Sequence, residues 1–223
     1  MKKSGGFTYL GLAAALAAWY NEKKETGDIM RKTQTRNTKG KIIAAAWKLF
    51  YEQGYEDTTV DEIIRAAQTS KGSFYHYFSG KDALLSTLAY LFDEKYEELL
   101  DQMDDSMDSF EKLIYLNNEL FTMIEDSISI DLLARLLSTQ LITRGEKSLL
   151  DRNRLYYRLL RQIISEGQER GELRSDVSAG EIVKIYALCE RSFLYDWCIS
   201  GGEYSLRSYS QRMLPMLLAD FRV

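Results

Sequence analysis

Apolar residues recur with a helical period from Thr38 onward, and polar residues divide this pattern into short segments. The first segment has apolar positions at intervals of four, seven and eight residues and ends near Gly54, which predicts an amphipathic helix. These positions are Ile42, Ala46, Leu49 and Phe50. Capping side chains at residues 57–59 then precede a second short helix. Its apolar positions are Val60, Ile63, Ile64 and Ala67.

A third short helix is expected after Ser70, whose side chain is suited to cap it. One face of this helix is aromatic, with Phe74, Tyr77 and Phe78. Its other faces carry Lys71, Ser73, Tyr75 and His76. Two short helices joined by a tight turn, the second polar on its outer side, predict a helix-turn-helix. Ser79-Gly80 ends this segment, and Lys81 begins a periodic run that we expect to form one helix from Asp82 to about Met103.

The remaining chain is expected to form further helices, so the predicted fold class is all-α. One Pro and 14 Gly among 223 residues are too few for the many turns of a sandwich or barrel. The predicted helices cover residues 84–100, 110–124, 130–142, 149–166, 179–199 and 204–221. We expect three parts: an N-terminal extension over 1–35, a three-helix domain with the helix-turn-helix over 36–82, and a helical domain over 83–223.

Charge is distributed unevenly, although the net charge of the chain is only −4. Residues 30–82 hold nine basic and six acidic residues, a net charge of +3. Residues 83–223 hold sixteen basic and twenty-four acidic residues, a net charge of −8. A small basic domain joined to an acidic one is compatible with nucleic-acid binding by the basic part.

The residue types that carry catalysis or bind metals are scarce. One His and two Cys exclude a zinc finger, a disulfide scaffold and most His-dependent catalysis. Cys189 and Cys198 lie about 13 Å apart along one predicted helix, too far to bridge. Buried apolar thiols are favoured over a redox sensor. With no phosphate-binding loop or nucleophile elbow, we predict no catalytic residues, no metal site and no cofactor, and therefore no enzyme.

Residues 7–20 form an apolar run that follows Lys2 and Lys3. As a helix this run spans about 21 Å, less than the roughly 30 Å of a membrane core. Small-residue cleavage sites fall inside the run, which is unusual for a signal peptide. We interpret residues 1–29 as a dispensable extension or a mis-assigned start, because Met30 opens a basic arm. A membrane-interface anchor is the second interpretation, and export is the third.

The stretch from Ile42 to Leu85 resembles the N-terminal domain of TetR-family transcriptional regulators. The matching positions are Phe50, Gly54, Thr58, Thr59, Val60, Ile63, Ala66, Ala67, residues 70–78 and Lys81. Two positions depart from the family pattern: Gln68 stands where Gly is usual, and Ile64 where a small residue is usual. Because Gly adopts a positive φ without strain, Gln68 is expected to cost about 1 kcal/mol if the turn keeps that geometry.

The resemblance implies that the third short helix lies in the major groove of double-stranded DNA. Lys71 would then donate to guanine or phosphate, and Gly72 would allow close backbone approach. The implied DNA-binding residues are Thr59, Ser70, Lys71, Gly72, Ser73, Tyr75, His76, Tyr77 and Lys81. Tyr77 shares the face of Phe74, so a place in the core is its alternative. A solvated surface charge is the alternative for Lys81. The basic arm over 31–41 would add sequence-independent attraction.

For residues 83–223 the resemblance implies a domain that binds an effector and dimerises. We expect a homodimer through helices over 182–199 and 206–221, with Phe193 and Trp197 in the interface. A place in the core of its own domain is the alternative for Phe193. The implied protein is a cytoplasmic one-component regulator, expected to be a repressor that a small apolar or amphipathic effector releases from a palindromic operator. The alternatives are an architectural or membrane-tethered DNA-binding protein, held through residues 7–20, and a helical enzyme that reuses the fold. The missing catalytic groups count against the enzyme.

Overall fold

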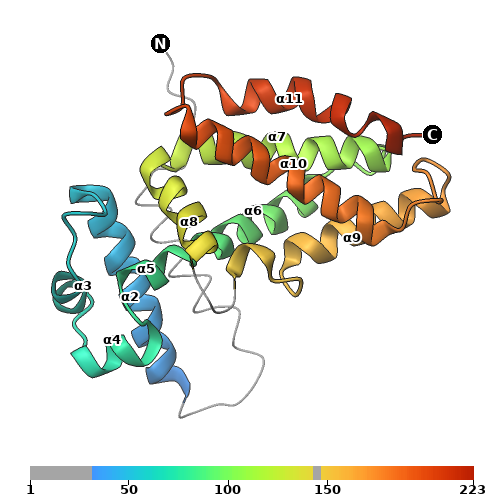
Figure 1. The fold of residues 1–223 in the computed structure, drawn as a ribbon. Helices are drawn as coiled ribbons and strands as arrows, with labels where there is room; N and C mark the ends of the chain where they lie inside the picture. Colours follow the sequence, from blue (N-terminus) through green and yellow to red (C-terminus); the bar gives the residue numbers. More distant parts are fainter. Residues whose placement is uncertain (1–31, 143–146) are drawn as a thin grey trace. The chain divides into compact units, whose positions relative to one another are not determined.

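The computed structural model describes residues 32–142 and 147–223 (Figure 1). The apolar run 7–20 and Arg31 lie outside these residues, and the interpretations of the N-terminal extension stay predictions. In the described part of the chain, no helix is long and apolar enough to cross a membrane.

The described residues are helical, which confirms the predicted all-α fold class. The α-helices are α2 (Lys32–Gln53), α3 (Val60–Ala66), α4 (Lys71–Tyr77), α5 (Lys81–Leu85), α6 (Leu88–Gln102), α7 (Ser109–Ser127), α8 (Ile130–Ile142), α9 (Leu155–Glu169), α10 (Ala179–Ile199) and α11 (Leu206–Leu217). Two short 3₁₀-helices are η1 (Ser148–Leu150) and η2 (Ala219–Phe221). Among these residues, the only sheet-like pairing is an isolated antiparallel bridge between Leu173 and Arg222.

The contacts within the chain divide it into two units, and the division falls between Leu91 and Phe92. The boundary expected from the sequence was earlier, after residue 82. The additional residues contribute to the core of the first unit, because the indole N–H of Trp47 in α2 donates to the hydroxyl of Thr87 at 2.8 Å. The leucines next to Thr87 in the sequence are buried as well: Leu84, Leu85 and Leu88.

In the first unit, α2 packs against both α3 and α4. The apolar period predicted for α2 is the reason, since Ile42, Ala46 and Phe50 are all buried. Ile63 from α3 and Phe74 from α4 are fully buried as well. Each short helix therefore contributes its apolar face to one small core, which holds the two helices of the helix-turn-helix in place.

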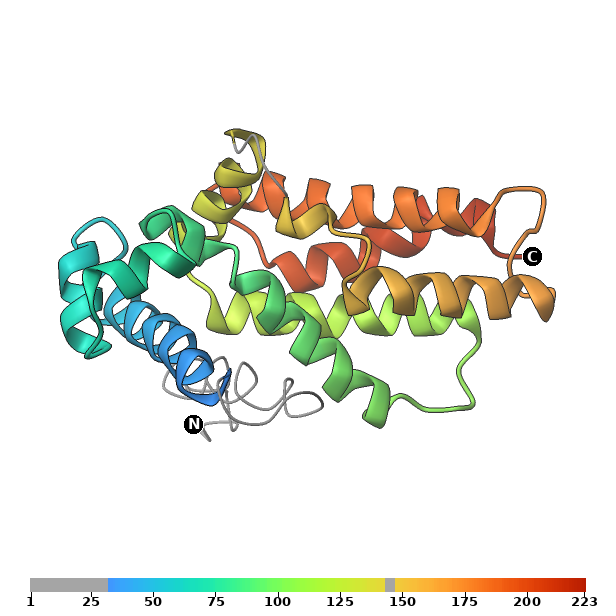
Figure 2. The same cartoon turned by 90° about the horizontal axis from the view of Figure 1, so that it is seen from below.

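In the second unit, α7 packs against α9 and α11, and α10 packs against α8, α9 and α11 (Figure 2). The largest buried side chains include Phe121 of α7 and Tyr186 of α10. The hydroxyl of Tyr186 donates to the carbonyl of Leu113 at 2.8 Å, so a polar atom in this core links α10 to α7.

The single helix expected from Asp82 to Met103 is wrong, because the chain breaks it into α5 and α6. The hydroxyl of Ser86 donates to the carbonyl of Ala83 at 2.7 Å, and the hydroxyl of Thr87 donates to the carbonyl of Leu84 at 2.6 Å. Hydroxyl side chains that bond local carbonyls compete with the helical hydrogen bonds. Two adjacent hydroxyls therefore interrupt an otherwise helical apolar pattern.

Two further predicted helices have different bounds. The helix expected over 149–166 begins only at Leu155, because the carboxylate of Asp151 accepts a hydrogen bond from the amide of Asn153 at 2.9 Å. This local bond favours a turn. The helix expected over 204–221 is α11 followed by η2. By contrast, the helices predicted over 130–142 and 179–199 match α8 and α10.

The expected interface residues Phe193 and Trp197 are buried inside one protomer, which corrects that prediction. Their exposed fractions are 7% and 4%. The ring of Phe193 packs against Phe121 and Tyr209, and the indole N–H of Trp197 donates to the carbonyl of Tyr204 at 2.9 Å. The apolar stripe of α10 is wide enough to suggest an interface, but these two positions lie on its inward side.

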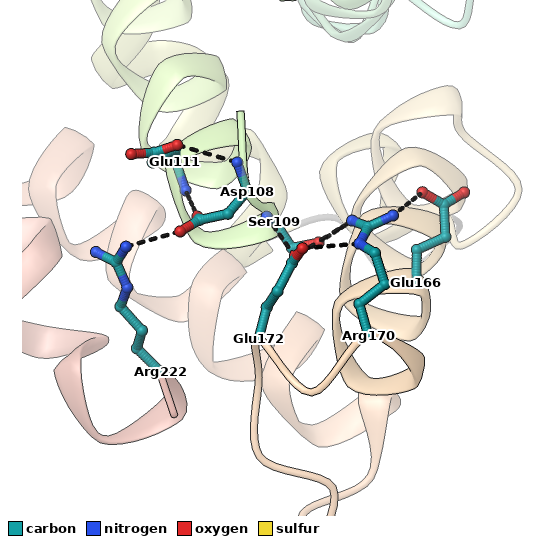
Figure 3. A network of polar contacts seen from close by, with 7 residues as sticks. All are labelled: Asp108, Ser109, Glu111, Glu166, Arg170, Glu172 and Arg222. Atoms are coloured by element: carbon teal, nitrogen blue, oxygen red, sulfur yellow. Dashed lines mark hydrogen bonds and ion pairs between the residues drawn. The ribbon is translucent and has the colours of Figure 1, made fainter. Parts of the chain in front are cut away.

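A polar network joins the start of α7, the end of α9 and the last residues of the chain (Figure 3). Glu172 accepts hydrogen bonds at 2.8 Å from the amide of Ser109 and from Nε of Arg170. The Arg170 guanidinium, followed by the Ser109 amide, lowers the pKa of Glu172 to about 2. Arg222 donates to the carboxylate of Asp108, the N-cap of α7, at 2.7 Å.

Both cysteines lie on α10 and are partly buried free thiols. Burial raises the pKa of Cys189, and it raises the pKa of Cys198 to about 11. Because the thiolate is the reactive form, these thiols have the character of packing residues rather than of a redox site.

Candidate nucleic-acid interface and effector cavity

The turn between α3 and α4 depends on a left-handed residue. Gln68 has φ +52°, the geometry expected at the position where the sequence departs from Gly. The amide of Gln68 donates to the carbonyl of Arg65, and the amide of Thr69 donates to the carbonyl of Ile64, both at 3.1 Å. This pair of bonds is a Schellman motif, which ends α3 and sets the direction of the following helix.

The helix α4 is held by one cap and two buried rings. The hydroxyl of Ser70 accepts a hydrogen bond from the amide of Ser73 at 3.0 Å. Phe74 and Phe78 are buried and pack against each other, with ring centroids 5.9 Å apart. Tyr75 lies between them in sequence and remains 50% exposed. The core thus fixes one face of α4 and leaves the other face in solvent.

Lys71, Gly72, Tyr75 and His76 form this outer face of α4 and are all exposed. The ammonium of Lys71 lies 3.6 Å from the carboxylate of Asp61 on α3, and both side chains are largely exposed. An exposed ion pair of this kind is weak, so the ammonium can exchange its partner for a phosphate or a base at small cost. Asp61 was not predicted as a partner of Lys71, although the sequence already places it in the first turn of the second short helix.

Gly72 is not required by the packing of the protein. A Cβ atom added there would meet only the Ser70 hydroxyl oxygen, at an ordinary 3.9 Å. A glycine in a helix is destabilising relative to alanine, because it loses more conformational freedom on folding. Its place on an exposed face therefore leaves the backbone open to close approach, and a contact with DNA there stays a prediction.

Three predicted contact residues use their hydroxyls in helix caps. The hydroxyl of Thr59 donates to the carboxylate of Glu62 at 2.7 Å and accepts from the Glu62 amide at 3.3 Å. The amide of Thr59, which donates to the Glu62 carboxylate at 2.8 Å, and then the Thr59 hydroxyl lower the pKa of Glu62. The hydroxyls of Ser70 and Ser73 lie 2.9 Å apart and bond to each other. Any contact of these three hydroxyls with DNA remains a prediction.

Lys81, unlike Lys71, donates hydrogen bonds to the backbone of a neighbouring loop. Its ammonium donates to the carbonyl of Tyr55 at 2.6 Å and to the carbonyl of Glu56 at 3.3 Å. The same ammonium lies 4.2 Å from the centroid of the Tyr55 ring. Lys81 therefore holds the loop between α2 and α3 and is more than a solvated surface charge, while a phosphate contact stays a prediction.

Tyr77 and His76 lie side by side at the end of α4. Their ring centroids are 4.8 Å apart in an edge-to-face arrangement. Tyr77 is half-buried and His76 is exposed. His76 has no metal-binding neighbours of the usual kind: among the residues that the structure describes, no group of three or more His, Cys, Asp or Glu is placed to hold a metal ion.

The second unit contains a cavity of about 50 Å³. Its lining is mostly apolar, but it includes two arginines, two tyrosines and a glutamate. The lining residues are Phe92, Tyr96, Leu120, Phe121, Ile124, Leu149, Arg154, Tyr156, Ala187, Glu190, Arg191 and Leu194. An apolar cavity with a few buried polar groups is the usual form of a small-molecule site.

Glu190 is the buried acid of this cavity, with an exposed fraction of 4%. One carboxylate oxygen accepts from the side-chain amide of Asn117 at 3.0 Å, and the other accepts from the hydroxyl of Tyr156 at 2.6 Å. Burial raises the pKa of Glu190, although both hydrogen bonds oppose the shift. Burial is therefore the strongest influence on the pKa of this carboxyl group.

Arg154 is neutralised by Asp93, and both side chains are at least 92% buried because their exposed fractions are 7% and 8%. The guanidinium donates from Nη2 and Nε to the two carboxylate oxygens of Asp93, at 2.8 and 3.1 Å. Bidentate geometry of this kind satisfies both charges in a dry environment. The pair therefore contributes no net charge to the cavity.

The residues of this cavity were not predicted, and only one of them carries a signal in the sequence. Glu190 stands within the apolar stripe of α10, four residues after Tyr186 and three before Phe193. A charged residue on a buried face needs a partner elsewhere in the fold. The partners themselves, Asn117 and Tyr156, are 73 and 34 residues away and carry no local pattern.

The comparisons with known proteins agree with this geometry. Residues 42–88 match the family model of bacterial regulatory proteins of the tetR family. An uncharacterized HTH-type regulator, YuxN of Bacillus subtilis (strain 168), is 47% identical over 26% of this chain. That match spans only 21% of the length of YuxN. The HTH-type transcriptional regulator HbdR of Aromatoleum sp. (strain CIB) is 29% identical over 81% of this chain and 79% of its own length.

Among solved structures, FadR of Thermus thermophilus is similar over most of both chains. It is a TetR-family transcriptional repressor in complex with lauroyl-CoA. The TM-score is 0.63 at 26% identity, over 82% of this chain and 94% of FadR. The likeness extends beyond the helix-turn-helix into the second unit.

Proposed function

The chain belongs to the TetR family of bacterial regulatory proteins, and from this membership we propose that it is a one-component repressor. In this proposal it binds a palindromic operator as a homodimer, and a small effector that enters the cavity of the second unit releases it. Proteins of this family are DNA-binding regulators rather than enzymes, and their work on DNA favours a cytoplasmic location.

The observation that carries the proposal is the outer face of α4. Phe74 and Phe78 anchor the helix, while Lys71, Gly72 and Tyr75 face solvent over little more than one helical turn. A recognition helix needs this division, because its N-terminal residues meet base edges while its inner face stays in the core. Nothing in the packing of the first unit requires Gly72, which favours close approach of a DNA backbone or base.

The cavity supports the release step. It is enclosed mainly by α6, α7, α9 and α10, and its polar groups come from positions far apart in the chain. A ligand that binds one arrangement of these helices better than another shifts the population toward that arrangement. A repressor that loses operator affinity in the shifted state would respond as proposed. The lauroyl-CoA complex of Thermus FadR is a precedent for such a ligand in a similar chain.

A stripe of exposed residues on α10 supports the homodimer. Its positions repeat at intervals of three and four: Ile185, Leu188, Ser192, Tyr195 and Ile199. Met216 and Leu217 of α11 are exposed to 67% and 52%. Apolar side chains at this spacing suit a helix pair between two copies of the chain. This stripe replaces Phe193 and Trp197 as the proposed interface.

The first experiment tests DNA binding. An operator is selected from random duplex DNA with the full chain, and its affinity is measured by fluorescence anisotropy. Lys71→Ala and Tyr75→Ala should each weaken operator binding by about 1–3 kcal/mol with unchanged circular dichroism. Lys48→Ala, an exposed charge on α2, is the control and should change little. Selection of no sequence above background would contradict the proposal.

The second experiment tests the dimer. Leu188→Glu places a charge in the exposed stripe and should yield folded monomers in sedimentation, with weak operator binding. Ser106→Glu, exposed in the loop before α7, adds the same charge and should leave the dimer intact. If Leu188→Glu remains dimeric, the interface lies elsewhere.

A further inference from the structure

Tyr96 lines the cavity, and its hydroxyl is buried without a hydrogen-bond partner among the described residues. Tyr96 is 1% exposed, and its ring packs against Tyr156 with centroids 5.4 Å apart. Within the described part of the chain, Oη of Tyr96 has no hydrogen-bond partner. Such a group loses its water on folding and gains nothing in return, so most buried hydroxyls are paired. The one other such atom, Oδ1 of Asn118, does not belong to a residue lining the cavity.

The other deeply buried polar groups of the cavity already have partners. The two oxygens of Glu190 accept from Asn117 and Tyr156, and Arg154 is held by Asp93. Tyr96 is therefore the exception in a site whose remaining polar groups are satisfied. An open buried donor on a residue that lines a cavity is explained if a ligand completes its hydrogen bond.

The charges around the cavity decide what kind of ligand this is. A carboxylate would find the guanidinium of Arg154 occupied on two of its nitrogens by Asp93, and it would approach the acid Glu190. The other cation of the lining, Arg191, is half-buried and donates to the hydroxyl of Tyr157 at 3.4 Å. An ammonium ion would face the guanidinium group of Arg191, which lines the same cavity and is not part of the Arg154–Asp93 pair. Burial of an unpaired charge is costly, whereas an uncharged oxygen needs only one donor.

The volume restricts the ligand further. A cavity needs about 10–15 Å³ to hold one group of the size of a water molecule, so a cavity of about 50 Å³ holds roughly three to five such groups. Most of its walls are aliphatic or aromatic. The cavity therefore fits a small molecule with one polar atom, or one end of a larger molecule.

We propose that the effector is an uncharged, mainly apolar molecule with an oxygen acceptor, such as a ketone, an ester or an alcohol, and that Tyr96 donates its hydrogen bond to this oxygen. This inference rests on the proposed release of the repressor by an effector in the same cavity. Tyr96 is then a binding residue, and its open hydroxyl selects ligands with an acceptor over purely apolar ones.

Binding to the full chain without DNA tests the inference, with three four-carbon probes of similar size and xenon, all observed by NMR. Butan-2-one carries the acceptor, butan-2-amine is a cation, butanoate is an anion, and xenon fills apolar space without hydrogen bonds. We expect butan-2-one to bind more tightly than the amine or butanoate. Tyr96→Phe should weaken butan-2-one by about three- to tenfold and leave xenon binding unchanged.

The stability of the ligand-free protein gives a second readout. Tyr96→Phe removes an unpaired buried hydroxyl, so its melting temperature should equal or exceed that of the wild type. Tyr156→Phe is the matched control: it removes a hydroxyl that Glu190 uses, so its melting temperature should fall. A fall for Tyr96→Phe as well would mean a structural partner for its hydroxyl and would overturn the inference.

Tighter binding of the amine or of butanoate would also overturn it, as would equal butan-2-one affinity in Tyr96→Phe and wild type. Operator release is measured separately, by anisotropy with selected DNA. If butan-2-one binds as expected but no probe or larger ketone changes operator affinity, the proposed function fails while the ligand class stands. If a charged molecule releases the operator through this cavity, the ligand class fails while the proposed function stands.

Discussion

The two units of this chain hold their polar side chains in opposite ways. In the first unit, the groups on α4 are exposed, and their supporting bonds are local: Ser70 caps its own helix through Ser73, three residues away. In the second unit, Arg154 and Asp93 are buried and lie 61 residues apart in sequence. A surface held by local bonds can change its side chains with little effect on stability, whereas removing one partner of a buried pair leaves the other partner unsatisfied. The first arrangement suits variation in the DNA sequence that is bound, and the second suits a defined cavity.

The largest expected effect comes from breaking the buried pair. Arg154→Met leaves the carboxylate of Asp93 buried without its guanidinium and should cost about 3–5 kcal/mol of unfolding free energy. Urea denaturation at pH 7 measures this loss. Arg135→Met breaks an exposed pair with Asp131 and should cost less than about 1 kcal/mol. Similar losses for both variants would remove the contrast between the two kinds of site.

A smaller effect is expected on α4, where function and stability should move in opposite directions. Gly72→Ala fits the protein and should raise the unfolding free energy by about 0.5–1 kcal/mol, while it weakens operator binding by about 1–3 kcal/mol. Gly180→Ala in α10, where an added Cβ meets no atom within 4 Å, is the control for helix propensity. Unchanged operator affinity in Gly72→Ala would show that the DNA backbone does not approach this position.

A substitution in the turn before α4 is expected to change the unfolding free energy by about 1 kcal/mol. Gln68 has a positive φ, which Gly adopts without strain, so Gln68→Gly should raise the unfolding free energy by about 1 kcal/mol. Thermal unfolding measures the gain. Gln68→Ala, which keeps the strained geometry, should give no such gain. A loss in Gln68→Gly would mean that the side chain of Gln68 contributes more than its backbone costs.

The smallest effect concerns pH and the network of Figure 3. The pKa of Glu172 is lowered to about 2, so its ionised form stabilises the fold above the ordinary value of 4.5. This contribution is lost as the pH falls from 4.5 toward 2, because Glu172 is protonated near pH 4.5 in the unfolded chain and only near pH 2 in the folded protein. The difference in urea midpoint between wild type and Glu172→Gln should therefore be largest near pH 7 and shrink below pH 4.5. A constant difference would contradict the assignment.

The fold was predictable wherever a local pattern determined it. The helix-turn-helix followed from apolar spacing and caps, and α8 and α10 matched their expected bounds. The break between α5 and α6 was not anticipated, because Ser86 and Thr87 could equally have bonded within a continuous helix. Phe193 was placed at an interface because periodicity identifies an apolar face and does not tell whether the same chain or a second copy covers it.

The two candidate sites also differ in how far the sequence predicts them. The residues of α4 form one short segment with a recognisable family pattern, so they could be named from the sequence. Tyr96, Glu190 and Arg154 come from three different helices or their edges, and only tertiary packing brings them to one cavity. Their chemistry depends on what burial does to them, and burial is a property of the fold.

The low reactivity of the two thiols of α10 makes it possible to measure the proposed release with a site-specific label. With a pKa of about 11, Cys198 is only about one part in ten thousand thiolate at pH 7, and Cys189 is shifted in the same direction. A cysteine introduced at the exposed Lys48 would keep an ordinary pKa and react far faster with maleimide reagents. One spectroscopic label could then be attached to each copy without removing the native thiols. The separation between two labels would report on the arrangement of the recognition helices with and without an effector.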